Sequence, residues 1–299
     1  MSASQTIASH QIRSSRGALT THQRTVVEYF NDSAGDYRLL WGTDRNLGLH
    51  CGYLDREHRG HDDAVRHMNR VLAETAGIEA PVRVLDAGCG IGGSAIWLAE
   101  NIGTEVVGVN IHPGQIEQAR RLAGELRLEE RIRFHVADFC ATGLEPESFD
   151  VVWALESACY AQDKPALIAE AWRLLKPGGR LIVADGFLTR EELTPKERRI
   201  VERWQCGWAI PSTPSKSQFA RWLCDAGFHD VVCRDITQHV APSSRRIYRA
   251  SLLFYPLGIA LYWLGLRSAI QTRGIASGYY QYRARRLGLG IYCVFTAEK

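Results

Sequence analysis

Five short apolar runs alternate with amphipathic stretches in the middle of the chain. The runs are VRVLDAG, TEVVGVN, IRFHVAD, FDVVWAL and GRLIVADG, all between residues 82 and 186. Helical patterns separate them, namely SAIWLAENIG, PGQIEQARRLAGELRL and DKPALIAEAWRLLKPGG, and we expect the last to stop at its Pro-Gly-Gly end. Strands that alternate with helices in this way predict an α/β fold, in which a parallel sheet is covered by helices on both faces.

Segments before and after this alternating part favour helices. Residues 25–80 are mostly helical in pattern and precede the first strand. Residues 187–225 and 243–282 add further helical stretches on top of the sheet. We therefore expect an N-terminal helical cap, a core over residues 81–299 and two helical insertions within that core.

The composition is that of a globular chain. Its 299 residues, 45% of them hydrophobic, are enough to bury a large core. The eight cysteines are scattered without a CxxC pair, which indicates buried thiols in a reducing compartment, the cytoplasm, and not a disulfide framework. Residues 1–24 carry Arg13, Arg16 and Arg24 without an acid, but they lack the apolar stretch of a secretion signal. We expect a flexible tail there, with a transit peptide as the alternative.

Positive charge and apolar residues concentrate in the last third of the chain. From Arg234 onward there are ten Lys or Arg against two acids, a net +8, so the whole-chain value of +3 leaves −5 for residues 1–233. The same part contains SLLFYPLGIALYWLGL at residues 251–266. This run is shorter than the roughly 20 residues that span a bilayer. It fits a core helix, a substrate lid or a helix at a membrane surface.

A glycine-rich turn, LDAGCGIGG, follows the first strand and leads into a helix. Gly88, Gly90, Gly92 and Gly93 permit positive φ there and let a ligand approach the backbone. In parallel sheets, ligands bind beyond the carboxyl ends of the strands, which is where this turn lies. The pattern is GxGxGG, whereas a dinucleotide fingerprint reads GxGxxG. On this stretch alone, both a dinucleotide and S-adenosylmethionine fit.

Several motifs in order resemble the class I S-adenosylmethionine-dependent methyltransferases: LDAGCGIGG, the strand end at Asp138, FDVVWALES and LLKPGG followed by RLIV. The resemblance covers roughly residues 24–299. YFNDSAGDYRLLWG with LGLHCGYLD, VGVNIHPGQIEQAR and ALESACY make the chain most similar to the C-methyltransferases of sterols, tocopherols and prenyl diphosphates, with fatty-acid cyclopropane synthases more distant. The family implies a Rossmann-like fold with a mostly parallel seven-stranded sheet, an N-terminal helical cap and a C-terminal helical lid.

The resemblance also implies a set of cofactor-binding residues. Asp86 and the first glycines of the turn are expected at the methionine half, and Asp138 at the adenine, although a turn cap is the plainer interpretation of either acid. Asn110 stands where many methyltransferases carry an acid, so an amide is expected to hold the ribose hydroxyls. The full set is His50, Gly52, Asp86, Gly88, Gly90, Asn110, Ile111, Gln115, Asp138 and Phe139.

The candidate catalytic residues follow from the chemistry of an alkene acceptor. Methylation turns an alkene into a carbocation, which needs aromatic faces to stabilise it and a base to remove a proton. Glu156, at the carboxyl end of the fourth strand, is the candidate base, and a salt-bridged surface glutamate is the alternative. Tyr160 and Trp208 are the candidate pocket walls, although most of the aromatic residues are expected to be core.

Arginines near the apolar run indicate an acceptor with an anionic head. The candidates are Arg199, Arg203, Arg245 and Arg246, because guanidinium groups bind phosphate oxygens in pairs. A prenyl diphosphate fits, with Mg²⁺ shared between its phosphates. A sterol or tocopherol-like lipid at an anionic membrane surface is the alternative.

The sequence therefore predicts a C-methyltransferase that acts on a small hydrophobic acceptor of isoprenoid type. O- or N-methylation of a lipophilic secondary metabolite is the alternative within the family, and an inactive cofactor-binding partner protein is the alternative outside it. We expect no nucleic acid as partner and leave peripheral membrane contact and homo-oligomer formation open. EHRGHDDAVRH contains His58, His61 and Asp62, but we expect no metal there and interpret the stretch as a solvated helix start, with Asp62 and Asp63 in the first turn.

Overall fold

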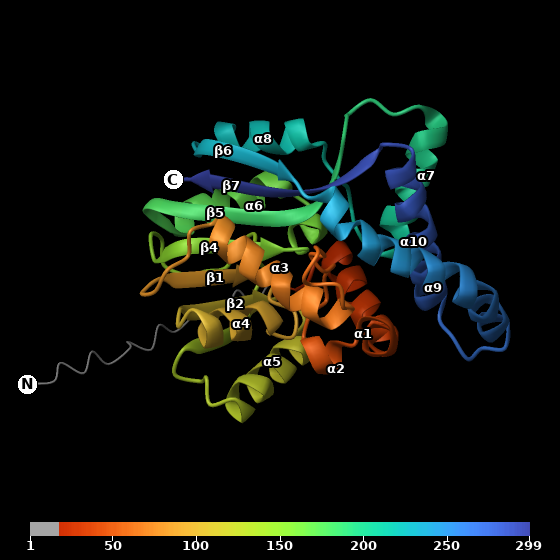
Figure 1. The fold of residues 1–299 in the computed structure, drawn as a ribbon, viewed down its shortest axis with the longest axis horizontal. Helices are drawn as coiled ribbons and strands as arrows, with labels where there is room; N and C mark the ends of the chain where they lie inside the picture. Colours follow the sequence, from red (N-terminus) through yellow and green to blue (C-terminus); the bar gives the residue numbers. More distant parts are fainter. Residues whose placement is uncertain (1–17) are drawn as a thin grey trace, which may run out of the picture.

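The centre of the molecule is one seven-stranded sheet, in a computed structural model that describes residues 18–299 (Figure 1). Its order is β3-β2-β1-β4-β5-β7-β6, with β7 antiparallel to both of its neighbours and the other pairings parallel. The strands are β1 (Arg83–Ala87), β2 (Glu105–Asn110), β3 (Ile132–Val136), β4 (Phe149–Leu155), β5 (Leu175–Leu188), β6 (His229–Asp235) and β7 (Gly290–Glu298). This arrangement confirms the predicted mostly parallel sheet.

Each face of the sheet buries its own hydrophobic core, because successive side chains of a strand point to opposite faces. Val84 of β1 belongs to a cluster with residues of α3 (His61–Thr75), α4 (Gly93–Asn101) and α5 (Pro113–Glu125). Its neighbour Leu85 belongs to a second cluster with α6 (Lys164–Leu174) and α8 (Lys216–Asp225). The prediction of helices on both faces is confirmed.

One predicted helix boundary is wrong. The pattern DKPALIAEAWRLLKPGG predicts a helix that stops at the Pro-Gly-Gly end, but α6 ends at Leu174 and the next residue begins β5, where Leu175 pairs with Phe149. Pro177 explains the difference, since it disfavours helical geometry at the residue before it and has no N–H to donate. The LKPGG segment is therefore the first part of a 14-residue strand.

Helices from both ends of the chain gather at one end of the sheet (Figure 1). The N-terminal ones are α1 (Thr21–Trp41) and α2 (Thr43–Asn46), and the C-terminal ones are α7 (Pro195–Gly207), α9 (Thr237–Trp263) and α10 (Ala269–Arg286). α10 packs against α7, α9 and α1. Glycine allows its close approach to α9, since a β-carbon at Gly278 would lie 2.4 Å from Ser251 Oγ. The predicted helices around the sheet are thus present.

The predicted flexible tail falls mostly on residues 1–17, which lie outside the described residues. Residues 21–24 of that segment belong to α1, which begins with a capping box between Thr20 and Gln23. All eight cysteines lie within the described part of the chain and are free thiols, as expected from their spacing. The expectation that they are buried holds for Cys51, Cys89 and Cys293, whereas Cys206, Cys224 and Cys233 are exposed.

Candidate active site

The turn between β1 and α4 has a backbone that side chains would obstruct. Gly88 has φ +89°, and a β-carbon there would lie 2.4 Å from the β-carbon of Ser157. Gly90 has φ +54°, and its β-carbon would lie 3.1 Å from Leu49 Cδ1. Both glycines are in the left-handed region, where L side chains are strained. This geometry exposes the backbone of the turn to the space beyond the sheet.

A cavity of about 270 Å³ lies beyond the carboxyl ends of the central strands, between the glycine-rich turn and α1. Clefts at this place in parallel sheets are the usual ligand sites. The sequence-predicted residues that line it are His50, Asp86, Gly88, Gly90, Asn110, Ile111, Gln115, Asp138, Phe139, Glu156, Tyr160 and Trp208. The structure therefore brings most of the expected site into one cavity.

Gly52 is the one predicted cofactor residue that does not line this cavity. Its backbone packs on α3, where a β-carbon would lie 2.7 Å from Ala64 Cβ, and its N–H donates to Ser243 Oγ at 3.2 Å. The family resemblance placed it with His50 over the cofactor, but the close packing of its backbone on α3 keeps it out of the cavity. Gly52 thus serves close packing of the loop on α3.

Asp86 offers an unpaired acceptor for a cationic group. The side chain is buried at the end of β1, and its Oδ2 has no hydrogen-bond partner among the described residues. Burial raises the pKa of Asp86 to about 7, and a hydrogen bond with the Ala95 backbone opposes this shift. A buried carboxylate oxygen that lacks a hydrogen-bond partner is costly. An ammonium group such as that of a bound amino acid moiety would satisfy it, so this end of the cavity fits the methionine half of S-adenosylmethionine.

The other end of the cavity presents amide and carboxylate groups at the ends of β2 and β3. Asn110 Oδ1 accepts from the His112 N–H at 3.1 Å, and its Nδ2 donates to Gln115 Oε1 at 2.7 Å. Asp138 accepts from Gln23 Nε2 of α1 at 2.7 Å and from the Cys140 N–H at 2.8 Å. These contacts hold polar groups where the ribose and adenine are expected, and α1 covers this end.

Glu156 lines the cavity just after β4, the strand that follows β1 in the sheet order on the side away from β2. Its backbone has φ 47°, an unusual value for a residue other than glycine. Oε1 accepts from the Cys51 N–H at 2.8 Å and from Tyr292 Oη at 2.9 Å, while Oε2 makes no hydrogen bond within residues 18–299. Burial raises the pKa of Glu156 to about 7, and nearby Asp185 adds to the shift. The carboxyl group is therefore poised to exchange a proton near neutral pH.

Tyr292 and Cys51 were missed by sequence reasoning. Tyr292 lies in β7, 136 residues after Glu156, and nothing in its apolar strand pattern signals a polar contact. Cys51 contributes only its backbone N–H, which no side-chain pattern reveals. Together they fix one carboxylate oxygen of Glu156 and leave the other directed to the cavity.

We expect Tyr292→Phe to move the activity profile to higher pH. The hydroxyl donates to Glu156 Oε1 and lowers the pKa of that carboxyl group, so its loss must raise the pKa above its value of about 7. Turnover at pH 7 should fall about tenfold or less and recover at pH 9. A pH–rate profile checks this. A loss that is equal at every pH would show that Tyr292 has only a structural role.

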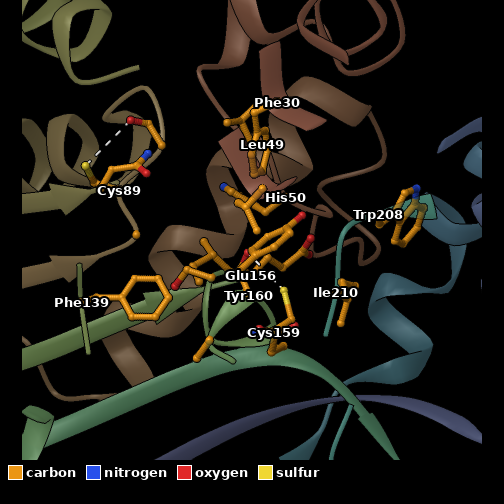
Figure 2. A pocket seen from close by; sticks show the side chains of 18 of the residues that line it. Phe30, Leu49, His50, Cys89, Phe139, Glu156, Cys159, Tyr160, Trp208 and Ile210 are labelled. Atoms are coloured by element: carbon orange, nitrogen blue, oxygen red, sulfur yellow. Dashed lines mark hydrogen bonds between the residues drawn. The ribbon is translucent and has the colours of Figure 1, made fainter. Parts of the chain in front are cut away.

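Aromatic side chains form the wall opposite the glycine-rich turn. Figure 2 shows Glu156 and Tyr160 in the middle of the pocket, with Cys89 and Phe139 on one side and Trp208 and Ile210 on the other. Tyr160 contacts Phe30 of α1, with ring centroids 5.4 Å apart. Trp208 is anchored by its Nε1, which donates to the Gly274 carbonyl at 3.1 Å. The expected positions of Tyr160 and Trp208 at the pocket are thus observed.

The four arginines expected to bind the acceptor do not reach this cavity. Arg199 and Arg203 are exposed on α7, and the guanidinium of Arg203 lies over the ring of Tyr280. Arg245 and Arg246 lie on α9 and do not line the cavity, although Arg246 lines a second one. These arginines were predicted to bind the acceptor because they lie near apolar or aromatic segments in the sequence, but on α7 and α9 they lie outside the lining of the large cavity.

Three residues with metal-ligand atoms lie close together near α3, and only one of them, His58, belongs to the set named from the sequence. Asp55, His58 and His67 place three metal-ligand atoms within 4.8 Å of one another. Each imidazole faces Asp55 at 3.0 Å through one nitrogen and the Arg70 guanidinium through the other. Since a guanidinium only donates, each ring must accept from it and donate to the carboxylate. The network is complete by itself and ties the loop to α3.

His61 and Asp62 have other partners. His61 contacts the Trp41 carbonyl at 3.0 Å, and Asp62 forms an ion pair with Arg45 at 2.8 Å. Asp62 and Asp63 lie in the first turn of α3, as predicted.

Comparison with known proteins agrees with this geometry. Residues 85–183 match the methyltransferase domain family. The chain is 33% identical over 206 residues to 27-O-demethylrifamycin SV methyltransferase of Amycolatopsis mediterranei (strain S699). The aligned region covers 68% of this chain and 73% of that protein. It is 29% identical over 269 residues to the chloroplastic tocopherol O-methyltransferase of Arabidopsis thaliana, with coverage of 84% and 73%.

The fold is shared with solved structures. The geranyl diphosphate C-methyltransferase of Streptomyces coelicolor A3(2), solved with Mg²⁺, geranyl-S-thiolodiphosphate and S-adenosyl-L-homocysteine, superposes with a TM-score of 0.74 at 23% identity. The match covers 94% of this chain and 99% of that one. Family match, relatives, sheet order and the glycine-rich cavity agree, and the chain belongs to the class I S-adenosylmethionine-dependent methyltransferases.

Proposed function

We propose that the protein transfers a methyl group from S-adenosylmethionine to an alkene carbon of an uncharged, lipophilic acceptor of isoprenoid type. The observation that carries this proposal is Glu156: a buried carboxyl group with a pKa of about 7, one oxygen held by the protein and the other left toward an aromatic-lined cavity. This is the arrangement that proton removal from a carbocation requires.

Residues of the chain suited to the cofactor lie on one side of Glu156. Asp86 would bind its amino group, the glycine-rich turn would lie along its methionine part, and Asn110 with Asp138 would bind the ribose and adenine. When bound, S-adenosylmethionine supplies a methyl group on a sulfonium centre, which is already a strong electrophile. The protein therefore has to align the acceptor and exclude water, more than to activate the methyl group.

Methyl transfer to an alkene creates a positive charge on the acceptor, and the residues around the acceptor have to stabilise it. The π pair of the alkene forms the new carbon–carbon bond as the bond between the methyl group and sulfur breaks, with its electron pair left on sulfur. A carbocation then remains on the neighbouring carbon of the acceptor. Aromatic faces of Tyr37, Tyr160 and Trp208 line the cavity and can stabilise it. A proton from the adjacent carbon then passes to Glu156 Oε2, and the pair of that C–H bond forms the double bond of the product.

The charge of the cavity favours an acceptor without a diphosphate. Its lining within the described residues includes no Lys or Arg, while its acidic residues are Asp86, Asp138, Glu156, Asp163 and Asp185. A diphosphate placed there would lack the cationic partners that phosphate oxygens require. A sterol or tocopherol-like lipid has a large apolar surface that the aromatic wall can cover. The relative named as a tocopherol methyltransferase supports this class of acceptor.

Labelled cofactor tests the reaction. The protein is incubated with S-adenosylmethionine labelled in the methyl group and with a sterol precursor, a tocopherol-like quinol, geranyl diphosphate or farnesyl diphosphate, and the label is located by NMR. Label on an alkene carbon of an uncharged acceptor supports the proposal. Label on oxygen or nitrogen overturns it in favour of heteroatom methylation, and cofactor binding without label transfer to any acceptor class points to an inactive binding protein.

We also expect activity to survive a chelator. Since no arginine or lysine among residues 18–299 lines the cavity, Mg²⁺-bound diphosphate should be a poor substrate and EDTA should change turnover by less than about twofold. Arg199→Ala serves as the matched variant and should leave the KM unchanged, because Arg199 is exposed on α7. Chelator-sensitive methylation of geranyl diphosphate, with a raised KM in Arg199→Ala, would contradict this expectation.

A further inference from the structure

The C-terminal half of α9 and the turn to α10 expose an apolar surface. We call residues 252–266 the apolar tip; they include no charged residue. Leu253, Trp263, Leu264 and Leu266 are each 70–79% exposed. The run is therefore not a core helix, which was one interpretation of the sequence. Exposed apolar side chains in such density mark an interaction site.

The tip projects away from the body of the molecule. In Figure 1, α9 and its turn into α10 form the right-hand end of the fold, far from the sheet. The hairpin is nevertheless well packed, because α9 approaches α10 closely at Gly278 and Arg267 at the turn pairs with Asp36 of α1. None of the helices within residues 18–299 is long and apolar enough to cross a membrane. The apolar tip is thus held in place at the surface of the molecule by the packing at its base.

Positive charge surrounds the apolar tip. Residues 237–286 contain eight arginines and no Asp or Glu. Arg249 lies just before the tip and Arg273 shortly after it, and both are exposed. Trp263 and Tyr262 add amphipathic rings of the kind that prefer the bilayer interface. An apolar element flanked by arginines complements an anionic bilayer, with the apolar side chains among the acyl chains and the guanidinium groups at the headgroups.

A second cavity lies next to the large one and to the base of this tip. It lies between α1, α9 and α10, and its wall includes Ala250 just before the tip, Phe254 of the tip and Ile275 of α10. Four residues line both this cavity and the large one: Tyr37, Trp41, Trp208 and Ile247. The charged residues of its lining, among those described, are Arg246 and Asp36, and Asp36 is paired with Arg267. Two adjacent cavities with common wall residues thus lie between the base of the tip and the aromatic wall beside Glu156.

We infer that the apolar tip docks on an anionic lipid bilayer and that the lipophilic acceptor passes from the bilayer through the second cavity to the active site. Docking rests on the tip and the arginines alone. The entry route rests on the proposed function, because it requires an acceptor that dissolves in the bilayer.

Vesicle binding tests the docking without cofactor or acceptor. The full chain is sedimented with vesicles of phosphatidylcholine, alone or mixed with phosphatidylglycerol. We expect binding to the mixed vesicles that weakens with salt, and about a tenfold or greater loss of partitioning in Leu253→Ser/Trp263→Ser. Leu126→Ser and Val232→Ser are the matched controls, since both residues are exposed apolar side chains on other elements, and they should bind as the wild type does.

Two results would overturn the docking. The first is wild-type protein that stays in solution with both kinds of vesicle, and the second is a tip variant that binds as well as the controls. Analytical ultracentrifugation of the same proteins tests whether a second copy of this chain covers the tip instead of a bilayer. If the tip variant converts a dimer into a monomer and no protein binds vesicles, the tip is an interface between two copies of this chain.

The entry route is tested with Ala250→Phe, which narrows the second cavity at a residue outside the large one. We expect kcat/KM for a bilayer-borne acceptor to fall about tenfold, with cofactor affinity unchanged and with a soluble short-chain acceptor still methylated. Equal activity of both proteins on the bilayer-borne acceptor would exclude this route. Absence of methylation by the wild type on any acceptor would instead count against the proposed function, and vesicle binding would remain a separate result.

Discussion

Glu156→Gln should lower turnover by roughly 10² to 10⁴ while leaving cofactor affinity nearly unchanged. Glutamine has the same shape and its amide oxygen can still accept from the Cys51 N–H and Tyr292 Oη, so the local structure is kept. What it lacks is a group that can take a proton from the acceptor. Single-turnover rates with labelled cofactor, together with calorimetric cofactor binding, measure the two effects separately.

The pH dependence provides an internal check on the role of Glu156. A base works only when deprotonated, so wild-type kcat/KM should rise as pH increases through about 7. The residual activity of Glu156→Gln should lack this step. Near wild-type turnover in the variant would show that Glu156 is only part of the scaffold, and an unchanged pH profile would assign the titration to another group, such as Asp185.

The same substitution should stabilise the protein at alkaline pH. The folded-state pKa of Glu156, about 7, lies above the ordinary value of 4.5, so burial of this group costs nothing below pH 4.5 and progressively more as pH rises to 7. The shift corresponds to a loss on the order of 3 kcal/mol in the free energy of unfolding. Glu156→Gln removes this loss, so urea unfolding at pH 8 should show a more stable variant, with little difference at pH 4.5.

The fold was largely predictable because buried parallel strands have a strong sequence signal. β1, β2, β4 and the second part of β5 are largely apolar runs between turns, β3 alternates apolar and polar residues, and the alternation of the strands with helices defines the architecture. The end of α6 was not predicted correctly, because LLKPGG looks like a helix stop while tertiary pairing with Phe149 makes it a strand. β6 is an exposed edge strand with a weak apolar pattern, so the full strand count came from family resemblance.

The candidate site was predictable where it depends on short segments of chain. Asp86, the glycines and Asn110 lie at strand ends or in the turn that follows, and the parallel sheet brings such positions together. The residues on the acceptor side of the cavity were harder to predict from the sequence, because most of them come from helices whose orientation is set by packing. Arg199 was chosen for its neighbours in sequence and lies outside the cavity, whereas Tyr37 and Tyr292 reach it from opposite ends of the chain.

Gly90→Val should abolish useful cofactor affinity while the fold persists. Gly90 lines the cavity with φ +54°, and its β-carbon would lie 3.1 Å from Leu49 Cδ1, so a branched side chain is strained there and also extends into the space for the methionine half. The backbone strain, about 1–3 kcal/mol, is the same with and without the cofactor and lowers only the stability of the fold. The loss of affinity, roughly 100-fold or more, is expected from overlap of the branched side chain with the cofactor.

Isothermal calorimetry with S-adenosylmethionine measures this loss, and far-UV circular dichroism verifies the fold. Gly60→Val is the matched control, because Gly60 is exposed, has φ −75° and has no neighbour closer than 4.0 Å to an added β-carbon. Valine adopts that backbone conformation without strain, so the control should bind the cofactor as the wild type does. Unchanged affinity in Gly90→Val would refute the assignment of the glycine-rich turn to the cofactor, whereas equal losses in both variants would indicate a general effect of valine on stability.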